Sequence, residues 1–279
     1  MSNHPRRRAP GDRSHLERLV QALSVEQGIA ADRLRRWVST TVLIGALERV
    51  GNDGHRFLLK GGVAIELRLR LRARATKDVD IIVACNGDAE IVEVLREALS
   101  EPHLDFSFRV TNPRDIAHTP AQRMDVKLTF KDKPWATVQL EASVPEAGAA
   151  EPELISAFSL TDFGLSGPDM VACQSLRYQM ATKLHAVTER FEDRENDRVR
   201  DLIDLMLLAD LDPDRARVRE ACLDIFTSRE RHQWPPRLTV EPSWPSQYRA
   251  LATEQGFVID DVQEAAGAVQ TLIDQIATA

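Results

Sequence analysis

Apolar residues recur at helical spacing through the first fifty residues of the chain. The run Ser14-His15-Leu16-Glu17 predicts a capping box at a helix start. Apolar residues continue from there at intervals of three and four. A second helix is predicted over about 32–50 and ends near Gly51. We therefore expect a helical hairpin, preceded by a loose tail.

Beyond residue 55 the pattern changes to short apolar runs. A strand is predicted at Phe57-Leu58-Leu59, followed by Gly61-Gly62, a helix over about 63–71 and a strand over 78–83. Gly87-Asp88 opens a further predicted helix. Alternation of apolar and polar residues predicts three more strands, at 104–110, 123–130 and 135–142. Helices among several strands indicate a sheet domain of α/β or α+β type over about 55–145.

The rest of the chain is predicted to be mostly helical. Residues 146–168 are rich in Ala, Gly, Glu and Pro, which predicts a linker. Asp212-Pro213 predicts a helix start with proline at its first position, whereas the proline-rich stretch 232–245 is expected to be an ordered connector. Helices are predicted over about 169–190, 195–210, 213–228 and 260–277. The expected divisions are a flexible basic tail (1–13), a sheet domain with the hairpin (14–145), the linker (146–168) and a helical domain (169–279).

Composition is that of an ordinary globular protein. Of the 279 residues, 43% are hydrophobic and 28% charged, which argues against disorder, collagen and coiled coil. The three cysteines are scattered and form no C-x-x-C pair, so neither a disulfide framework nor a zinc site is expected. No apolar run reaches the ~18 residues that a membrane span needs, and no apolar segment follows the basic N-terminus. We expect a cytoplasmic protein without a membrane partner.

Positive charge is concentrated in two short segments of a chain whose net charge is −7. Residues 1–13 and residues 66–77 are both strongly basic. A nucleic-acid binder of this net charge needs such local concentration. A solvated face is the alternative for each segment.

Asp78 and Asp80 are the first candidates for chemistry. Alternation along a strand places both carboxylates on one face, where they can hold Mg²⁺ together with substrate phosphates. Gly61 and Gly62 precede them between a strand and a helix, so backbone N–H groups there can approach a phosphate. The alternative is an ordinary turn beside a polar strand end.

Three further candidates stand later in the chain. Glu141 can complete a metal site or accept a proton from an attacking hydroxyl, or it is simply an outward residue of an amphipathic strand. Lys183 lies in an otherwise apolar helix of a chain with only six lysines, although an amphipathic surface lysine is the alternative. Asp201 and Asp204 share one face of the next helix. His185 is a candidate for catalysis, but a buried packing role is favoured.

Several of these segments resemble one family. Residues 57–64 (FLLKGGVA), 74–80 (RATKDVD), 183–186 (KLHA) and 196–205 (NDRVRDLIDL) resemble the AbiEii/AbiGii-type nucleotidyltransferase toxins, within the DNA polymerase β-like superfamily. Phe226-Thr227-Ser228-Arg229, Trp244 and Tyr248 extend the likeness, which covers roughly 14–275 and is closest to the MenT-like branch. The resemblance implies an α+β nucleotidyltransferase fold, in which a mixed sheet is flanked by an N-terminal helical segment and a C-terminal helical domain.

The resemblance also implies roles for individual residues. Asp78 and Asp80 match the metal carboxylates, and Gly61 and Gly62, with Lys60 beside them, match the phosphate-cradling turn. Lys183 matches a lysine that contacts the triphosphate, and Asp204 matches its acidic partner. Related chains usually carry Asp where this chain has Glu141, which puts that third ligand in doubt. Some relatives are silenced by phosphorylation of a hydroxyl at the place of Thr76.

The function implied is that of a toxin in a toxin-antitoxin system. Mg²⁺ and NTP are implied as cofactor and co-substrate, a cognate antitoxin as partner, and the tRNA 3′ end as acceptor, so that translation stops. The basic residues Arg68 and Arg72 stand four apart, which predicts that they share one helix face. Both are expected to contact RNA, and no DNA partner is expected. The alternatives are transfer to a small molecule or a protein hydroxyl, or a non-catalytic interaction protein with a retired site.

Overall fold

The structure, a computed structural model, describes residues 8–49, 57–84, 90–117 and 119–279. These residues form two compact units. The first, here called the sheet unit, comprises the described residues up to Arg68, Ala75–Val144 and Leu154–Cys173. The second, the helical unit, comprises Leu69–Arg74, Pro145–Glu153 and Gln174–Ala279.

The sheet unit begins with the predicted helical hairpin, α1 (Arg13–Gln27) and α2 (Ala31–Glu48). The predicted capping box is wrong, because the helix starts earlier: Asp12 is the N-cap, and its carboxylate accepts a hydrogen bond from His15 N at 2.7 Å. Of the expected loose tail, residues 1–7 lie outside the described residues. Arg8 is exposed, but its backbone lies against Gly164, where a Cβ atom would be 2.4 Å from the Arg8 carbonyl oxygen. Gly51 also lies outside the described residues.

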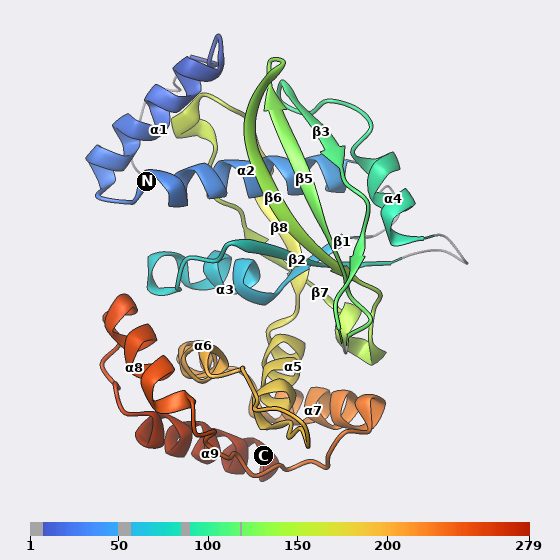
Figure 1. The fold of residues 1–279 in the computed structure, drawn as a ribbon, viewed down its shortest axis with the longest axis vertical. Coiled ribbons are helices and arrows are strands. Elements are labelled where there is room, and N and C mark those ends of the chain that lie inside the picture. Colours follow the sequence, from blue (N-terminus) through green and yellow to red (C-terminus); the bar gives the residue numbers. More distant parts are fainter. Residues whose placement is uncertain (1–7, 50–56, 85–89, 118) are drawn as a thin grey trace. The chain divides into compact units, whose positions relative to one another are not determined.

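The strands form one mixed sheet in the order β3-β5-β6-β2-β1-β8-β7, with β4 beside β5 (Figure 1). The pairs β2–β6 and β1–β8 are parallel, whereas β1–β2, β3–β5 and β5–β6 are antiparallel. The strands are β1 (Phe57–Lys60), β2 (Asp78–Val83), β3 (Phe106–Val110), β4 (Arg114–Asp115), β5 (Gln122–Phe130), β6 (Lys133–Ser143), β7 (Pro152–Ser156) and β8 (Met170–Gln174).

The two faces of this sheet differ in chemistry. Val79, Met124, Val126 and Leu140 are buried and join the core, to which α2 contributes. In Figure 1, α2 crosses behind the long strands, and Trp135 Nε1 of β6 donates to Ser39 Oγ of α2 at 3.0 Å. The opposite face of β3, β5, β6 and β2 carries mainly charged and polar side chains, here called the polar sheet face. Four of the predicted site residues lie there, namely Lys60, Asp78, Asp80 and Glu141.

Two strands lie where the sequence predicted a linker and the start of a helix. β7 falls inside the expected linker, and β8 occupies the first residues of the helix expected over 169–190, which begins only at Leu176. Both strands are five residues long, and a short apolar run does not distinguish a strand from a helix turn. The linker also contains the 3₁₀ helices η2 (Ala147–Ala150) and η3 (Thr161–Phe163).

The helix after β1 begins and ends two residues earlier than predicted. α3 spans Gly61–Leu69, and the 3₁₀ helix η1 (Arg70–Arg72) follows. Arg70 has φ of +56°, which ends the α-helix. The helix expected beyond Gly87-Asp88 is α4 (Ile91–Ala98), although the two opening residues lie outside the described residues.

The helical unit contains α5 (Leu176–Thr188), α6 (Arg200–Ala209), α7 (Arg215–Arg229), α8 (Trp244–Gln255) and α9 (Val262–Ala277). The cap predicted at Asp212 is wrong by two residues: the N-cap of α7 is Asp214, which accepts from Arg217 N at 3.2 Å. α8 was not predicted, and its first two residues fall in the proline-rich stretch expected to be a connector. Proline is tolerated in a first helical turn, which is where Pro245 stands.

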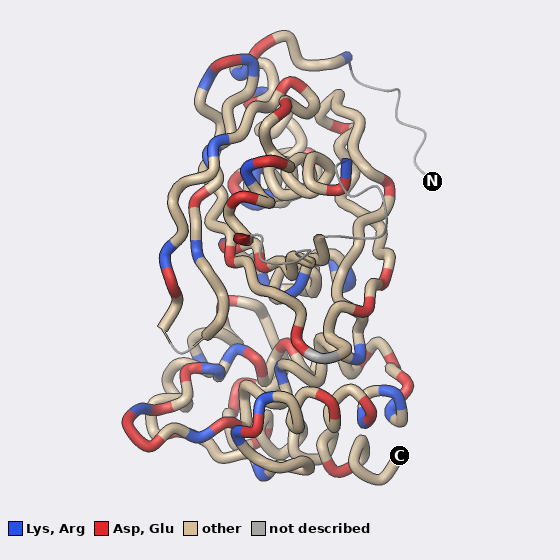
Figure 2. The backbone as a smooth tube through the Cα atoms, turned by 90° about the vertical axis from the view of Figure 1, so that its right-hand side faces the viewer, with Lys and Arg blue, Asp and Glu red and all other residues tan. Residues whose placement is uncertain are grey.

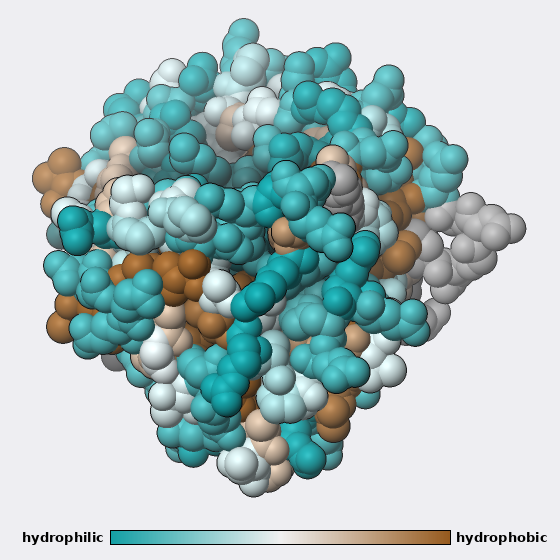
Figure 3. All heavy atoms as spheres, turned by 60° about the horizontal axis from the view of Figure 1, so that its bottom comes forward, coloured by the Kyte–Doolittle hydropathy of each residue, from teal (hydrophilic) through white to brown (hydrophobic). Residues whose placement is uncertain are grey.

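The surface is mostly hydrophilic in the view of Figure 3, with scattered apolar groups. Figure 2 shows Lys and Arg interspersed with Asp and Glu in both units. Within the part of the chain that the structure describes, no helix is both long and apolar enough to span a membrane.

Candidate active site

Asp78 and Asp80 project from the same face of β2, opposite the buried Val79. Asp78 lies opposite Gln139 of β6 in the sheet register. Asp80 lies between Glu141 of β6 and Lys60 of β1. Strand pairing therefore brings four of the predicted residues, Lys60, Asp78, Asp80 and Glu141, together on the polar sheet face. Lys60 Nζ donates to Ser143 Oγ at 2.7 Å.

Gly61, directly after β1, is packed against Asp80. Its φ is +58°, a conformation that glycine adopts without strain. A Cβ atom at this position would lie 2.0 Å from Asp80 Oδ2 and 2.7 Å from Asp80 Cγ, so a side chain here would displace the Asp80 carboxylate. Gly61 and Gly62 begin the nine-residue helix α3. The N–H groups of a first helical turn are not used within the helix and suit an anion.

Glu141, the candidate third carboxylate, is ion-paired with Arg123 of β5. Arg123 Nε and Nη2 donate to Glu141 Oε1 at 2.9 Å and 2.5 Å. The hydrogen bond with Glu141 and the charges of Glu141, Asp78 and Asp80 raise the pKa of Arg123 above its ordinary value. Arg123 was not predicted to belong to the site. Its position in the alternating pattern of β5 indicates only that it lies on the face opposite the buried residues.

A second residue of β6, Gln139, contacts Asp78. Its Nε2 donates to Asp78 Oδ1 at 2.8 Å. This hydrogen bond fixes the orientation of one carboxylate oxygen of Asp78. Gln139 was also missed, because the parallel pairing of β2 with β6 joins segments about sixty residues apart.

The carboxylates fit a divalent metal that arrives with its substrate. Among the described residues, no three His, Cys, Asp or Glu side chains are gathered as a metal-binding cluster. Asp78 and Asp80 nevertheless offer two carboxylates on one face, and the absence of a side chain at Gly61 lets the Asp80 carboxylate lie directly against the start of α3. Mg²⁺ is commonly held by one or two carboxylates together with substrate phosphates. The donor set therefore suits a metal–NTP complex.

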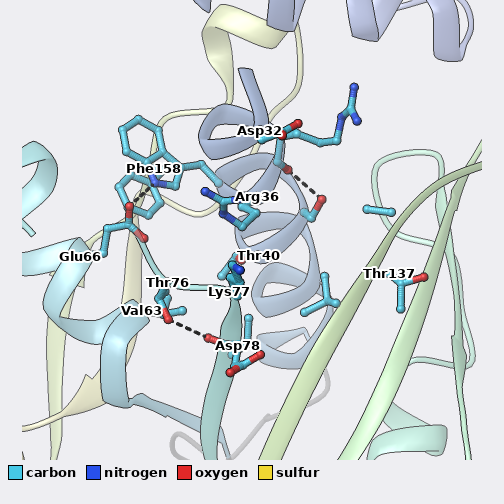
Figure 4. A pocket seen from close by; sticks show the side chains of 16 residues that line it. Asp32, Arg36, Thr40, Val63, Glu66, Thr76, Lys77, Asp78, Thr137 and Phe158 are labelled. Carbon is cyan, nitrogen blue, oxygen red and sulfur yellow. Dashed lines mark hydrogen bonds between the residues drawn. The ribbon is translucent and has the colours of Figure 1, made fainter. Parts of the chain in front are cut away.

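A pocket of about 290 Å³ opens where β2 begins. Figure 4 shows Thr76, Lys77 and Asp78 lining it across from Arg36 and Thr40 of α2. Thr76 Oγ1 donates to the carbonyl oxygen of Asp78 at 3.3 Å. This contact is the strand-capping role that threonine often has. It also places the Thr76 hydroxyl, half-buried, within two residues of the candidate metal carboxylates.

In the helical unit, Lys183 of α5 is held by two carboxylates of α6. Lys183 Nζ donates to Asp201 Oδ1 at 2.5 Å and to Asp204 Oδ2 at 2.9 Å. Burial alone would lower the pKa of Lys183, but Asp201 and Asp204 raise it above its ordinary value. The lysine is therefore a buried, permanently charged group rather than the surface residue of the alternative interpretation.

Asp204 also accepts a hydrogen bond from Arg74 Nη2 at 3.4 Å. Its side chain is 1% exposed. Burial alone would raise the pKa of Asp204, but Lys183 and Arg74 hold it below the ordinary value. The sequence-predicted pair of Lys183 and Asp204 is thus in direct contact within the helical unit, and Arg74 joins it.

The expectation that Arg68 and Arg72 share one helix face is wrong. Arg68 stands in the last turn of α3, whereas Arg72 belongs to η1, beyond the break at Arg70. Arg72 Nη1 lies 3.9 Å from Asp210 Oδ2 in an exposed ion pair. Such pairs contribute little to stability.

His185 is a packing residue in the core of the helical unit, as favoured from the sequence. Its side chain is fully buried, and its ring lies 4.5 Å from that of His232 and 4.8 Å from that of Phe226. Arg229 Nη1 lies 3.3 Å from His185 Nδ1, and Glu189 lies 3.9 Å away. Burial, followed by the charges of Arg229, His232 and Arg231, lowers the pKa of His185 to about 3.

Because His185 is buried with a lowered pKa, we expect the folded protein to lose stability in acid. An unfolded histidine has a pKa of about 6.5, so the unfolded state binds more protons below that pH. The stability that neutral His185 contributes is complete above pH ~6.5 and falls by up to about 1.4 kcal/mol per pH unit down to pH ~3. We expect the stability difference between wild type and His185→Gln to shrink from pH 7 to pH 5 in denaturant titrations.

An equal difference between wild type and His185→Gln at pH 7 and pH 5 would contradict the assignment.

Together, the mixed sheet, the two carboxylates of β2 and the glycine pair that begins α3 define a nucleotidyltransferase fold. The structure is similar to MenT4, the nucleotidyltransferase toxin Rv2826c from Mycobacterium tuberculosis H37Rv, with a TM-score of 0.56 and 18% sequence identity. The match covers 94% of this chain and 98% of that one.

The sequence also identifies the protein family. The family model described as "Nucleotidyl transferase AbiEii toxin, Type IV TA system" matches residues 45–271. The chain therefore belongs to the AbiEii family of nucleotidyltransferase toxins. No curated protein matches it. Family and fold support an enzyme that uses NTP, and the family implies an antitoxin partner.

Proposed function

We propose that the protein transfers a nucleoside monophosphate from NTP to the 3′-hydroxyl of tRNA and so blocks translation in the cytoplasm. The observation that carries this proposal is the packing of Gly61 against Asp80, with Asp78 on the same face. A carboxylate pair beside a helix N-terminus has the chemistry to receive a metal-bound triphosphate.

In the proposed transfer, the bonds that form and break belong to the two substrates. The acceptor oxygen forms a bond to the α-phosphorus, and the bond from that phosphorus to the pyrophosphate oxygen breaks. Asp78 and Asp80 would hold Mg²⁺, which stabilises negative charge on the phosphates when it is bound. Gln139 keeps Asp78 oriented. Glu141 is the proposed acceptor of the hydroxyl proton, through Oε2, because Arg123 contacts Oε1.

Lys183 is the proposed contact to the triphosphate. Its raised pKa keeps it charged at physiological pH, so it can neutralise the pyrophosphate that leaves. Asp204 and Asp201 act as positioning residues that hold the ammonium group in place. In the sheet unit, the triphosphate would be contacted by Lys60, Gly61 and Gly62. The proposed contacts to RNA phosphates are Arg68 and Arg72.

The test is incubation with total RNA and each α-labelled NTP in turn. Label at the 3′ end of tRNA supports the proposal. Label on protein or on a small molecule supports the alternative transferases instead. A flat calorimetric titration with Mg-NTP, together with no labelled product, would show a non-catalytic interaction protein.

Thr76 is the proposed site of regulation by phosphorylation. A phosphate adds about −1.5 to −2 charges, here within two residues of Asp78 and in a pocket that Arg36 also lines. It would repel NTP and compete for the metal. We expect Thr76→Glu to lose most transferase activity and Thr76→Val to keep it. Mass spectrometry of the toxin co-produced with its antitoxin should find Thr76 modified; an unmodified Thr76 in a neutralised toxin would exclude this route.

A further inference from the structure

Five residues share the polar sheet face near the candidate metal carboxylates: Ser107, Arg109, Lys127, Thr129 and Thr137. Together with Arg13, Phe108, Leu128, Pro134, Trp135 and Ala136 they line a cavity of about 570 Å³, which shares Ala136 and Thr137 with the pocket at Thr76. Arg109 of β3 and Lys127 of β5 are exposed cations, and the other three residues carry hydroxyl groups. We call these five residues the basic hollow. Cations and hydroxyls together are the usual protein ligands of phosphate oxygens.

The two cations lie directly opposite each other across neighbouring strands. Arg109 is the register partner of Lys127, and like charges in such a pair destabilise a sheet. No ion pair is found for either residue within the part of the chain that the structure describes. The nearest carboxylate along β5, Asp125, already pairs with Arg114 at 3.6 Å. The juxtaposition therefore favours an external anion over this part of the sheet.

The register also gives the distance from the basic hollow to the candidate catalytic carboxylates. Lys127 lies opposite Thr137 of β6, and Asp78 lies opposite Gln139 of the same strand. Lys127 and Asp78 are therefore two strands and two residues apart, or about 12 Å from the strand spacings of ~4.8 Å and ~3.4 Å. Stacked nucleotides advance about 3.4 Å each. The hollow is thus about three nucleotides from a hydroxyl that reacts at Asp78.

We propose that the basic hollow binds the sugar-phosphate backbone of the RNA acceptor about three nucleotides before its 3′ end. Arg109 and Lys127 contact phosphate, and the hydroxyls of Ser107, Thr129 and Thr137 fix its position. This inference rests on the proposed transfer to RNA and names the surface that holds the acceptor. The strand then runs along the polar sheet face with its 3′-hydroxyl at Asp78 and Asp80.

The test compares two double variants that lose the same charge. Arg109→Gln/Lys127→Gln removes both cations of the hollow, and Arg219→Gln/Arg249→Gln removes two exposed cations on α7 and α8. Binding of fluorescently labelled tRNA is measured by anisotropy from 50 to 200 mM KCl, without NTP. Each lost phosphate contact reduces the slope of log K against log salt by about one. We expect a reduction of about two for the hollow variant and none for the control.

Two further measurements separate binding from folding and from catalysis. Because like charges are removed, the hollow variant should unfold at a temperature no lower than wild type, and its affinity for Mg-NTP should be unchanged. The swap Arg109→Lys/Lys127→Arg should restore the wild-type slope. A hollow variant with wild-type slope and Kd would overturn the inference. The proposed function would survive that result as long as wild type labels tRNA.

Discussion

Asp80→Asn is expected to abolish nucleotide transfer while leaving the fold intact. Asparagine keeps the shape that packs against Gly61 but removes the negative charge that would hold the metal. A metal ion supplies several kcal/mol of charge stabilisation in such reactions, and ~4 kcal/mol corresponds to a loss of about 10³-fold in rate. Labelled-NMP transfer to tRNA should fall by at least this factor, and growth inhibition by the toxin should disappear.

Asp125→Asn is the matched control for that experiment. Asp125 lies on the same sheet face, half-buried on β5, and pairs with the exposed Arg114. Exposed ion pairs are worth about 0–1 kcal/mol, so this variant should keep its transferase activity. A folded Asp80→Asn protein that still transfers nucleotides and remains toxic would refute the metal-carboxylate mechanism.

The elements that carry the site could be predicted because their signals are local. The apolar run of β1, the double glycine and the alternation of β2 stand next to one another in the sequence, and the structure confirms this order of strand, helix and strand. The same holds for α1, α2 and the long strands β5 and β6, whose periodicity extends over many residues.

The contacts of the site could not be predicted because they depend on pairing between distant segments. Gln139 reaches Asp78, and Arg123 reaches Glu141, only because the sheet orders β5, β6 and β2 side by side. The same applies to Arg109 and Lys127, which no motif singles out. β8 was missed for a related reason: its five residues become a strand by parallel pairing with β1, where Leu59 meets Cys173.

The predicted end of the helix after β1 was wrong because a single backbone conformation determines where that helix ends. The positive φ of Arg70 ends α3 and separates Arg72 from Arg68. Non-glycine residues adopt this conformation rarely, so a regular run of arginines and leucines does not predict a break in the helix. The prediction of two RNA contacts on one helix face depended on that run remaining helical.

Gly61→Ala is expected to inactivate the enzyme by displacing Asp80 rather than by unfolding the protein. The added Cβ would lie 2.0 Å from Asp80 Oδ2, so the carboxylate has to move by more than an ångström. A misplacement of about 1 Å in an active site costs roughly 10²-fold in rate. The left-handed backbone adds a stability loss of about 1–2 kcal/mol.

Gly28→Ala separates these two effects. Gly28 caps α1 with φ of +66°, close to the +58° of Gly61, but no atom lies within 4 Å of a Cβ built there. Both variants should therefore lose a similar free energy of unfolding in denaturant titrations, whereas only Gly61→Ala should lose transfer of labelled NMP to tRNA. Equal activities of the two variants, measured on folded protein, would show that the contact between Gly61 and Asp80 does not shape the site.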